Sequence, residues 1–236
     1  MKPLLGAVFA LLFLQTGKLV AKDVTVGTGP AAKAGDILTV DYTGKLMNGK
    51  QFDSSVGKKP FVFILGAGMV IQGWDNGMVG MKAGGKRELT IPSNLAYGDQ
   101  GAGEDIPPKA TLKFDVSLIK IDQIETKILT EGKGTKAKAG DTCELHYVLT
   151  DKDGKKLDSS YDRNQTFQVV IGRSKLITGF TAGLLGMQQG EKRRLTIPPQ
   201  FAYGDKGAGG VVPPNATLTF EIEMVKLLSA KKGEDN

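Results

Sequence analysis

YGDQGAGEDIPPKATLKFDV, from Tyr97 to Val116, returns almost unchanged as YGDKGAGGVVPPNATLTFEI, from Tyr203 to Ile222. Tyr97 and Tyr203 stand 106 positions apart, whereas the repeats of solenoid and propeller proteins run about 20–50 residues. A period this long is typical of a duplicated domain. Whatever function this motif carries, the chain therefore carries it twice.

Shorter motifs flank these segments in the same order in both copies. They are DYTGKL at Asp41 and HYVLTD at His146, FDSS at Phe52 and LDSS at Leu157, and GKRELTIP at Gly85 and EKRRLTIP at Glu191. A chain of 236 residues accommodates two domains of about 100 residues, each with its own core. We therefore expect a leader over 1–21, a first domain over 22–121, a linker over 122–125, a second domain over 126–228 and a polar tail over 229–236.

The first residues predict a secretory signal peptide. Lys2 precedes an uncharged, apolar run over residues 4–14, and polar residues follow it. This run has about half of the ~20 residues that a membrane-spanning helix needs, and a positive charge before a short apolar segment is the layout of a secretory leader. The cleavage position stays undecided between Gly17 and Ala21. A signal peptide normally has a small residue two positions before its last residue, but Gln15 stands there in the first case and Leu19 in the second.

The predicted leader predicts a location in the secretory pathway, either in the lumen of the endoplasmic reticulum or outside the cell. The last residues, KKGEDN, are not a retention signal of the KDEL type, so they do not support retention in the lumen. Two triplets, Asn164-Gln165-Thr166 and Asn215-Ala216-Thr217, match the acceptor sequence for N-glycosylation. They become relevant only in that compartment.

The overall composition is that of an ordinary soluble globular protein, with 40% hydrophobic and 24% charged residues. The net charge is +6, but charges of both signs alternate along both copies and no basic run exceeds a few residues. This pattern predicts a mildly basic, solvated surface rather than a nucleic-acid partner. We expect no stable membrane association once the leader is removed.

Hydrophobic periodicity predicts strands and one short helix in each copy. Apolar and polar residues alternate over 38–42, 112–118 and 218–224, which is the pattern of half-buried antiparallel strands. Between Ile71 and Met81, and again from Ile177 to Met187, apolar residues recur every three or four positions, as on one helix face. We predict an α+β fold in which each domain is a curved antiparallel β-sheet wrapped around one short α-helix, duplicated in tandem. Such a sheet leaves a pocket at the helix end.

The polar residues exclude most enzyme chemistry. His146 is the single histidine, and Asp41 stands at its place in the first copy, so a duplicated function cannot depend on it. Cys143 is the single cysteine, and its place on a predicted strand indicates a buried, inert thiol. Neither a nucleophile with its base, nor a cluster of metal ligands, nor a phosphate-binding loop can be assembled. We therefore predict no cofactor and no metal.

The residues that repeat are aromatic and aliphatic. The aromatic set of the first copy is Tyr42, Phe52, Phe61, Trp74, Tyr97 and Phe114, with Asp53 as the one acid beside it. Core packing accounts for most of these side chains taken singly. It accounts less well for the two tyrosines, whose hydroxyls need partners when buried, and for the tryptophan at the start of the helix.

In this order the residues resemble the FKBP family, the immunophilins that have peptidyl-prolyl cis-trans isomerase activity and bind macrolides such as tacrolimus and rapamycin. The resemblance covers residues 23–228, and its motifs in the first copy are YTG at Tyr42, FDSS at Phe52, VIQGWDNG at Val70, LTIP at Leu89, AYG at Ala96 and IPPKATLKFDV at Ile106. So many ordered landmarks are highly specific. The resemblance implies the same α+β fold, proline-containing polypeptides as substrates and macrolides as ligands.

The resemblance also implies a set of pocket residues in each copy. In the first copy the implied catalytic residues are Tyr42, Phe52, Asp53, Ile71, Trp74, Tyr97 and Phe114. The implied substrate-binding residues there are Phe61, Val70 and Ile106. In the second copy the implied substrate-binding residues are Tyr147, Leu157, Asp158, Phe167, Leu176, Ile177, Phe180, Tyr203, Val212 and Phe220.

Proline isomerisation requires only a small reduction of the rotation barrier. The rotation barrier of an amide is ~18–20 kcal/mol, and a turnover of about 10² per second corresponds to ~15 kcal/mol, so only about 4–5 kcal/mol must be removed. An apolar pocket that strips water from the amide disfavours the planar, more polar ground state. By resemblance, Trp74 forms the floor under the proline ring, while the Ile71 N–H and the Tyr97 hydroxyl hold substrate carbonyls. The resemblance also implies that ring edges of Tyr42, Phe52 and Phe114 face the amide oxygen.

The floor and the ring edges differ between the copies. Leu157 stands for Phe52, and Phe180 stands for Trp74. The change from Trp to Phe keeps an aromatic floor, whereas the change from Phe to Leu removes a ring edge from the amide site. We therefore expect the first copy to be the better isomerase.

The charged residues of the pocket differ as well. In the family that the chain resembles, an arginine after this motif often pairs with the pocket acid. The resemblance implies that Arg163 can reach Asp158 in the second copy, whereas Asp53 lacks such an arginine in the first copy, which is one residue shorter after FDSS. The long loops carry acidic residues at 104–105 and apolar ones at 210–211. These differences predict different substrate preferences.

The leading hypothesis is an FKBP-type isomerase that acts on prolines of secretory or extracellular proteins and assists their folding. The alternative is a non-catalytic module that binds proline-containing peptides or acts as a chaperone, and a regulatory partner protein is the third possibility. Trp74, Tyr97 and Phe52 favour catalysis in the first copy. Leu157 makes the binding alternative nearly as good for the second.

Overall fold

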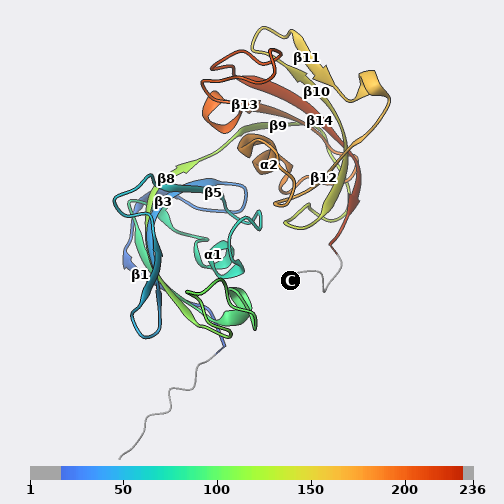
Figure 1. Ribbon diagram of the computed structural model, residues 1–236. Helices are drawn as coiled ribbons and strands as arrows, with labels where there is room; N and C mark the ends of the chain where they lie inside the picture. The colour runs from blue at the N-terminus through green and yellow to red at the C-terminus, as the bar shows by residue number, and fades with distance from the viewer. Residues whose placement is uncertain (1–16, 231–236) are drawn as a thin grey trace, which may run out of the picture.

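The computed structural model describes residues 17–230 and shows two main antiparallel sheets, each wrapped around a short helix, and a small two-stranded sheet of β2 and β6 (Figure 1). The first domain contains β1 (Val20–Thr25), β2 (Thr28–Ala31), β3 (Ile37–Leu46), β4 (Gln51–Ser54), β5 (Phe61–Ile64), α1 (Gln72–Gly77), β6 (Lys82–Ala83), β7 (Lys86–Ile91), the 3-10 turn η1 (Ser93–Leu95) and β8 (Leu112–Asp122). The second contains β9 (Glu125–Thr130), β10 (Thr142–Thr150), β11 (Lys156–Ser159), η2 (Tyr161–Arg163), β12 (Phe167–Val170), α2 (Thr178–Leu184), β13 (Lys192–Ile197), η3 (Pro199–Phe201) and β14 (Leu218–Leu228). The α+β fold class predicted from the sequence is confirmed.

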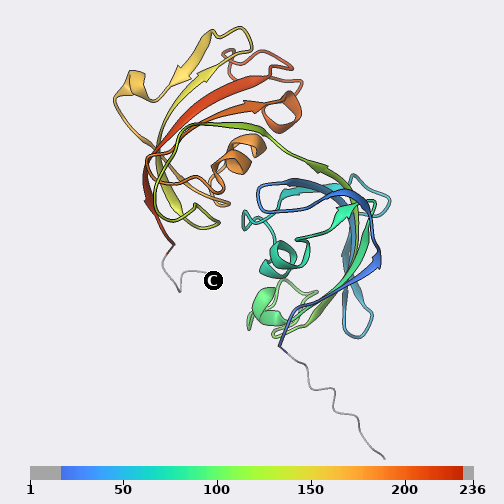
Figure 2. The ribbon, with the colours of Figure 1, turned by 180° about the vertical axis from the view of Figure 1, so that it is seen from behind.

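The two main sheets have the same topology. In the first, the strand order is β1-β7-β8-β3-β4, and β5 also pairs with β3; in the second it is β9-β13-β14-β10-β11, and β12 also pairs with β10. The outer edge of β3 changes partner along its length, because β5 pairs with residues 37–40 and β4 with residues 43–45. A register shift between Thr39 and Val40 on the β8 side adds a local bend. Both views show the sheet curved around its helix (Figures 1 and 2).

Each helix lies close to its sheet because its glycines face the strands. A Cβ atom on Gly73 would lie 2.2 Å from Cγ2 of Ile91, and one on Gly77 would lie 2.8 Å from Cδ2 of Leu89. The second domain repeats both contacts, with Gly179 and Gly183 of α2 against Ile197 and Leu195 of β13. Any larger residue would push the helix away, so these glycines set how deeply the helix start sits in the concave face.

Both helices are shorter than the apolar periodicity predicts. α1 ends at Gly77 rather than near Met81, and α2 ends at Leu184 rather than Met187. Gly80 and Gly186 follow with φ angles of 83° and 77°, a left-handed conformation that ends helices. Met81 and Met187 are buried all the same. The periodicity therefore reported burial correctly but overestimated helix length.

The two domains share an apolar contact. Two residues separate β8 from β9, and the core of the second domain also buries three residues of the first, Ile37, Ile64 and Ala67. A Cβ atom on Gly172 would lie 1.9 Å from the Ala67 carbonyl oxygen, so the two backbones touch. The Gln123 side-chain amide donates to the buried Asp36 carboxylate at 2.8 Å and ties the linker to the first domain.

The predicted leader lies mostly outside the described residues, which begin at residue 17. β1 begins at Val20, and Val20 and Ala21 pair with Thr90 and Leu89 of β7. Cleavage after Gly17 would leave β1 whole, and cleavage after Ala21 would shorten it by two exposed residues. The predicted polar tail is described only to residue 230, and within 17–230 no helix is long and apolar enough to cross a membrane.

Candidate functional site

The concave face of the first sheet carries a cluster of aromatic rings around Trp74. This side chain comes from α1 and is 4% exposed. Tyr42 of β3 and Phe114 of β8 meet its ring edge-on, with centroids 5.1 and 5.3 Å away, and Phe61 of β5 lies at 6.2 Å. Phe52 of β4 packs edge-on against Phe114 at 5.6 Å. These five residues, all predicted from the sequence, surround one apolar floor that we call the first pocket.

Donors without partners lie beside this floor. The N–H of Ile71, the residue that caps α1, donates to no acceptor among residues 17–230, and the Tyr97 hydroxyl makes no hydrogen bond to them either. Burial raises the pKa of Tyr97 and the nearby Asp53 carboxylate raises it further, so this hydroxyl stays protonated. The buried Nε1–H of Trp74 is also unpartnered within the described part of the chain. The first two groups are free to bind a carbonyl oxygen.

The segment that bears Val70 and Ile71 is fixed by Asp75. Its carboxylate accepts hydrogen bonds from the N–H groups of Gly66 and Gly68 at 2.8 and 2.9 Å. Burial raises the pKa of Asp75, and these two bonds oppose the rise. Sequence reasoning missed Asp75 because it is not repeated, since a threonine stands at its place in the second copy. The remaining predicted residue, Ile106, is buried in the long loop.

Tyr42 and Asp53 form a hydrogen-bonded pair at the edge of the first pocket. The Tyr42 hydroxyl donates to Asp53 at 2.5 Å, and the Ser54 N–H donates to the same carboxylate at 2.7 Å. Burial raises the pKa of Tyr42, and the bond to Asp53 and its charge raise it further. A cleft of about 430 Å³ adjoins the pair, lined by Tyr42, Asp53, Phe61, Ser54, Ser55, Lys58, Lys59, Pro60 and Val62.

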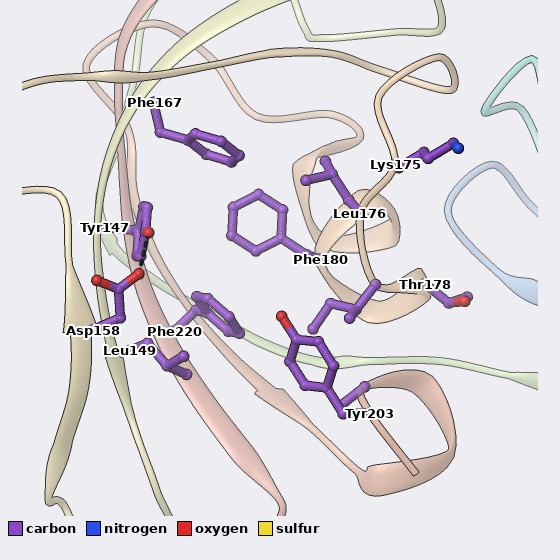
Figure 3. Close-up of a pocket in the computed structure, with 12 residues that line it drawn as sticks. Tyr147, Leu149, Asp158, Phe167, Lys175, Leu176, Thr178, Phe180, Tyr203 and Phe220 are labelled. Atoms are coloured by element: carbon purple, nitrogen blue, oxygen red, sulfur yellow. Dashed lines mark hydrogen bonds between the residues drawn. The ribbon is translucent and has the colours of Figure 1, made fainter. Parts of the chain in front are cut away.

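The second domain has a cavity at the place that matches the first pocket, with a volume of about 580 Å³ (Figure 3). It is lined by eight of the ten residues that the sequence predicted there: Tyr147, Asp158, Phe167, Leu176, Ile177, Phe180, Tyr203 and Phe220. The other two, Leu157 and Val212, are not among the lining residues and pack against the core. Phe180 forms the floor, and its ring meets Phe220 edge-on at 5.0 Å. We call this cavity the second pocket.

Sequence reasoning missed four of the lining residues, Leu149, Lys175, Thr178 and Ala202. Lys175 and Thr178 lie at the rim and point away from Phe180 (Figure 3). Donors without partners recur as well: the N–H of Ile177 and the hydroxyl of Tyr203 make no hydrogen bond to residues 17–230. The Tyr203 hydroxyl points towards the Phe180 floor (Figure 3).

Leu149 explains how the second pocket accommodates Leu157. Gly44 stands at the place of Leu149 in the first domain, and a Cβ atom on it would lie 2.7 Å from the Phe52 ring and 2.8 Å from the Phe114 ring. Phe52 therefore uses the space above Gly44. In the second domain the Leu149 side chain lines the cavity and the smaller Leu157 does not. The lost ring edge is thus replaced by an aliphatic surface from a different strand.

Arg163 pairs with Asp158, as the sequence predicts. Its guanidinium donates to Asp158 at 2.6 Å and to the Tyr147 hydroxyl oxygen at 2.8 Å, while Tyr147 donates to Asp158 at 2.5 Å. Burial alone would raise the pKa of Asp158, but the hydrogen bonds from Arg163, Tyr147 and Ser159 outweigh it and lower the pKa. In the first pocket no cation within residues 17–230 forms an ion pair with Asp53.

The chemistry open to both pockets is narrow. Within residues 17–230 no group of three or more His, Cys, Asp or Glu side chains could hold a metal ion. Cys143 is buried, and burial raises the pKa of its thiol to about 12, so it is not a nucleophile. His146 neighbours Tyr147 on β10 and faces away from the pocket, where it stacks on Tyr161. What remains is an apolar floor, ring edges and free donors.

Such a site defines a class of proteins that bind a small apolar ring flanked by carbonyl groups in a sheet wrapped around one helix. The family profile of the FKBP-type peptidyl-prolyl cis-trans isomerases matches residues 29–119 and 133–225. The chain belongs to this family and carries two tandem copies of its domain.

Curated relatives resemble most of the chain. It is 41% identical over 197 residues to mouse peptidyl-prolyl cis-trans isomerase FKBP9 and 41% identical over 198 residues to human FKBP10, which is 80% and 81% of this chain and 34% of each relative. The chain thus spans about a third of the length of these relatives. FK506-binding protein 4 of Rhizopus delemar is 54% identical over 103 residues, 44% of this chain and 27% of that protein.

Among solved structures, the three FKBP domains of wheat FKBP73 cover 90% of this chain and 96% of their own, with a TM-score of 0.46 and 24% identity. The crystal structure of AtFKBP13 covers 44% of this chain and 93% of its own, with a TM-score of 0.42 and 45% identity.

Proposed function

We propose that the protein is a peptidyl-prolyl cis-trans isomerase whose two pockets bind proline-containing polypeptides, the first pocket being the more active. The observation that carries the proposal is that each pocket combines a buried aromatic floor with two unpartnered donors. In the first pocket these are Trp74 with the Ile71 N–H and the Tyr97 hydroxyl. The tandem match to the isomerase family supports it.

The geometry suits rotation of an amide bond without covalent chemistry. The proline ring lies on Trp74, the two free donors hold carbonyl oxygens on either side, and ring edges surround the carbonyl that turns. Because the planar amide is more polar than the twisted one, an apolar enclosure destabilises the ground state more. Lowering the ~18–20 kcal/mol barrier by about 4–5 kcal/mol gives a turnover of about 10² per second. No proton transfer and no cofactor enters this step.

The first pocket has the better surroundings for catalysis. Phe52 places an aromatic edge beside Phe114, whereas the corresponding space of the second pocket is bounded by aliphatic Leu149. Aromatic ring edges carry partial positive charge and attract a carbonyl oxygen, which an aliphatic side chain does not. The second pocket therefore holds the proline ring with less stabilisation of the turning carbonyl.

The proposed setting is the secretory pathway, in the lumen of the endoplasmic reticulum or outside the cell, where the protein assists the folding of proline-containing clients. The apolar run that follows Lys2 supports this location. Macrolides of the tacrolimus type are the proposed competing ligands for the same floors. The resemblance to a relative named FK506-binding protein 4 supports that assignment.

A non-catalytic binding role is the second candidate, and the second pocket favours it. Its cavity of about 580 Å³ is open, and Arg163 holds Tyr147 and Asp158 together at its wall. A pocket with this floor retains proline-containing segments even where it does not accelerate their rotation. Chaperone-like holding of clients would then be its contribution.

The test is isomerisation of a short Leu-Pro-Phe peptide by the full chain, with and without a tacrolimus-like macrolide. Trp74→Ala and Phe180→Ala remove the two floors in turn; we expect the first to abolish most of the turnover and the second a smaller part. Replacing a buried aromatic residue by alanine costs about 3–5 kcal/mol, so circular dichroism must show that each variant is folded. Tyr97→Phe and Tyr203→Phe, which remove one hydroxyl each, form a milder matched pair.

The outcomes separate the two candidates. Turnover that the macrolide blocks and that Trp74→Ala removes supports the isomerase. Macrolide binding by a folded chain without turnover leaves a pair of proline-binding modules. A folded chain that neither binds the macrolide nor accelerates rotation contradicts both.

A further inference from the structure

The first N-glycosylation triplet, Asn164-Gln165-Thr166, lies at one wall of the second pocket. Asn164 caps the C-terminal end of η2 with a φ angle of 48° and directly follows Arg163, whose guanidinium contacts Asp158 and Tyr147 of the cavity wall. The Asn164 side chain is exposed and makes no hydrogen bond to any other residue within 17–230. The fold therefore makes no use of this amide group.

The second triplet, Asn215-Ala216-Thr217, lies at another wall of the same pocket. The Asn215 N–H donates to the Gly204 carbonyl at 2.8 Å, beside Tyr203, which lines the cavity. The Asn215 side chain is also exposed and also without a partner in the described part of the chain. Asp158 and Tyr203 lie at two different edges of the cavity (Figure 3). The two acceptor residues thus adjoin two different segments of the wall of one pocket.

The first domain has no such triplet at either place. Its shorter loop over 58–60 contains no asparagine, and Lys109 stands at the place of Asn215. Asparagine tolerates positive φ better than most residues, which alone would explain its presence in a turn. Lys109 nevertheless adopts a φ angle of 60°, close to the 56° of Asn215, so this turn does not require asparagine. Turn geometry therefore does not account for the asparagine at position 215.

We propose that Asn164 and Asn215 are N-glycosylated and that the two glycans screen the second pocket from bulky substrates while the first pocket stays open. The donor is an oligosaccharide linked to a lipid pyrophosphate. The Asn Nδ2 bonds to C1 of the first sugar, the bond between C1 and the pyrophosphate oxygen breaks, the lipid pyrophosphate leaves, and Nδ2 gives up one proton. The site assignment rests on the proposed entry into the secretory pathway; the screening effect also rests on the proposed isomerase activity.

The folded domain accommodates both glycans. Each acceptor side chain is exposed on a turn, so a bulky hydrophilic group attached there displaces no packed residue. A flexible peptide can still pass between two glycans and reach Phe180. A large, partly folded client meets them first, so the second pocket becomes selective for short or extended segments.

The modification is tested on the full chain expressed in eukaryotic cells, by gel mobility before and after treatment with peptide-N-glycosidase. We expect a shift of two glycans in the wild type, of one in Asn164→Gly or Asn215→Gly, and of none in the double variant. Glycine adopts positive φ without strain, so the turns persist. The matched control is Lys109→Asn, which completes an acceptor triplet with Ala110 and Thr111 and adds one glycan in the first domain.

Screening is tested in the Trp74→Ala background, where the second pocket supplies the remaining turnover. Enzymatic removal of the glycans is expected to raise turnover on an unfolded protein whose refolding is limited by proline and to leave peptide turnover unchanged. Equal turnover on the protein substrate before and after removal overturns the screening effect. Modification of the Lys109→Asn site but not of the native ones overturns the site assignment. If neither the native sites nor the Lys109→Asn control carries a glycan, the protein does not enter the secretory pathway, and the site assignment is overturned for that reason. The isomerase assay on purified protein does not depend on this result.

Discussion

The two pockets are built on matching strands but fill the same space in opposite ways. In the first, Gly44 leaves room for the ring of Phe52, which packs against Phe114. In the second, Leu149 stands at the place of Gly44 and lines the cavity, whereas Leu157, at the place of Phe52, does not. The residue at one of these positions cannot be interpreted without the other. The presence of Leu157 in place of Phe52 resembles the loss of a functional ring. It is instead one half of a paired exchange, whose other half is Leu149 in place of Gly44.

The largest effect is expected from breaking this pairing with Gly44→Leu. A leucine there overlaps both neighbouring rings, and overpacking of this kind costs about 1–3 kcal/mol and occasionally more. We expect a loss of about 3 kcal/mol and of most turnover in the first pocket. Trp74 is the single tryptophan, so its fluorescence during urea unfolding reports on the first domain alone.

Phe52→Leu supplies the control for this variant. In the double variant Gly44→Leu/Phe52→Leu the two changes reproduce the arrangement of the second pocket, and part of the lost stability should return, with a coupling energy of about 1–3 kcal/mol. Turnover should stay low, because the ring edge is still missing. Strictly additive losses of stability would show that the two positions are not paired.

The next prediction tests whether the two pockets differ in turnover because of their own residues or because of the contact between the two domains. Gly172→Ala places a Cβ atom 1.9 Å from the Ala67 carbonyl oxygen, so the backbones of the two domains must move apart at this contact. Non-glycine residues at such positive φ cost roughly 1–2 kcal/mol. Gly154→Ala is the matched control, since its φ angle of 83° is similar to the 80° of Gly172 but open space surrounds it.

We expect Gly172→Ala to lower the stability further than Gly154→Ala and to separate the unfolding of the two domains in calorimetry. If each pocket keeps its own turnover after separation, the difference lies in the pocket residues. If the turnovers converge, the contact between the domains creates it.

The sequence predicted the fold because the repeat displays every strand twice, and a pattern seen twice at one spacing is hard to produce by chance. It also predicted the rings that gather around Trp74 and Phe180, since strand alternation places them on one face. Helix lengths were overestimated because the glycines that end the helices do so through positive φ, which an apolar period does not report.

The paired exchange was missed for a different reason. Gly44 and Leu149 form no motif, and only a three-dimensional neighbour, Phe52, gives Gly44 its meaning. Asp75 was missed because it is not repeated, although it holds the segment before α1 through two N–H groups. The contact between Ala67 and Gly172 joins segments more than a hundred residues apart, and no local pattern indicates it.

A smaller effect is expected from exchanging the floors. The buried Nε1–H of Trp74 has no partner in the described part of the chain. A buried donor without a hydrogen-bond partner lowers the folding stability by about 1–3 kcal/mol. Trp74→Phe removes that cost but also removes packed atoms, so we expect stability to change by less than about 1.5 kcal/mol. Peptide turnover should fall towards that of the second pocket.

The reverse exchange, Phe180→Trp, brings a larger ring and an unpartnered N–H into the second pocket. We expect it to destabilise the second domain by about 1–3 kcal/mol. Urea unfolding of both variants gives the comparison, with the second domain followed by circular dichroism. Two equal and opposite changes would show that the floors are interchangeable and that the difference between the pockets lies at Gly44 and Leu149.

The smallest effect concerns charge, because an exposed ion pair contributes only about 0–1 kcal/mol. The folded-state pKa of Asp158 lies below its usual 3.8, so its contribution to stability is present above that value and is lost as the pH falls through the lower folded value. Arg163→Gln removes the charged donor, burial then dominates, and the pKa of Asp158 rises. The variant should therefore lose this contribution at a higher pH than the wild type.

NMR titration of the Asp158 carboxyl measures this shift directly, and the Lys58→Gln variant of the first pocket is the control. Lys58 bonds the Ser54 carbonyl rather than Asp53, so its removal should leave the Tyr42–Asp53 pair in place. An Asp158 that keeps its low pKa in Arg163→Gln would mean that Tyr147 and the Ser159 N–H suffice to hold the carboxylate. The two pockets would then differ in the charge at their rim, and the ionisation of Asp158 would not depend on that charge.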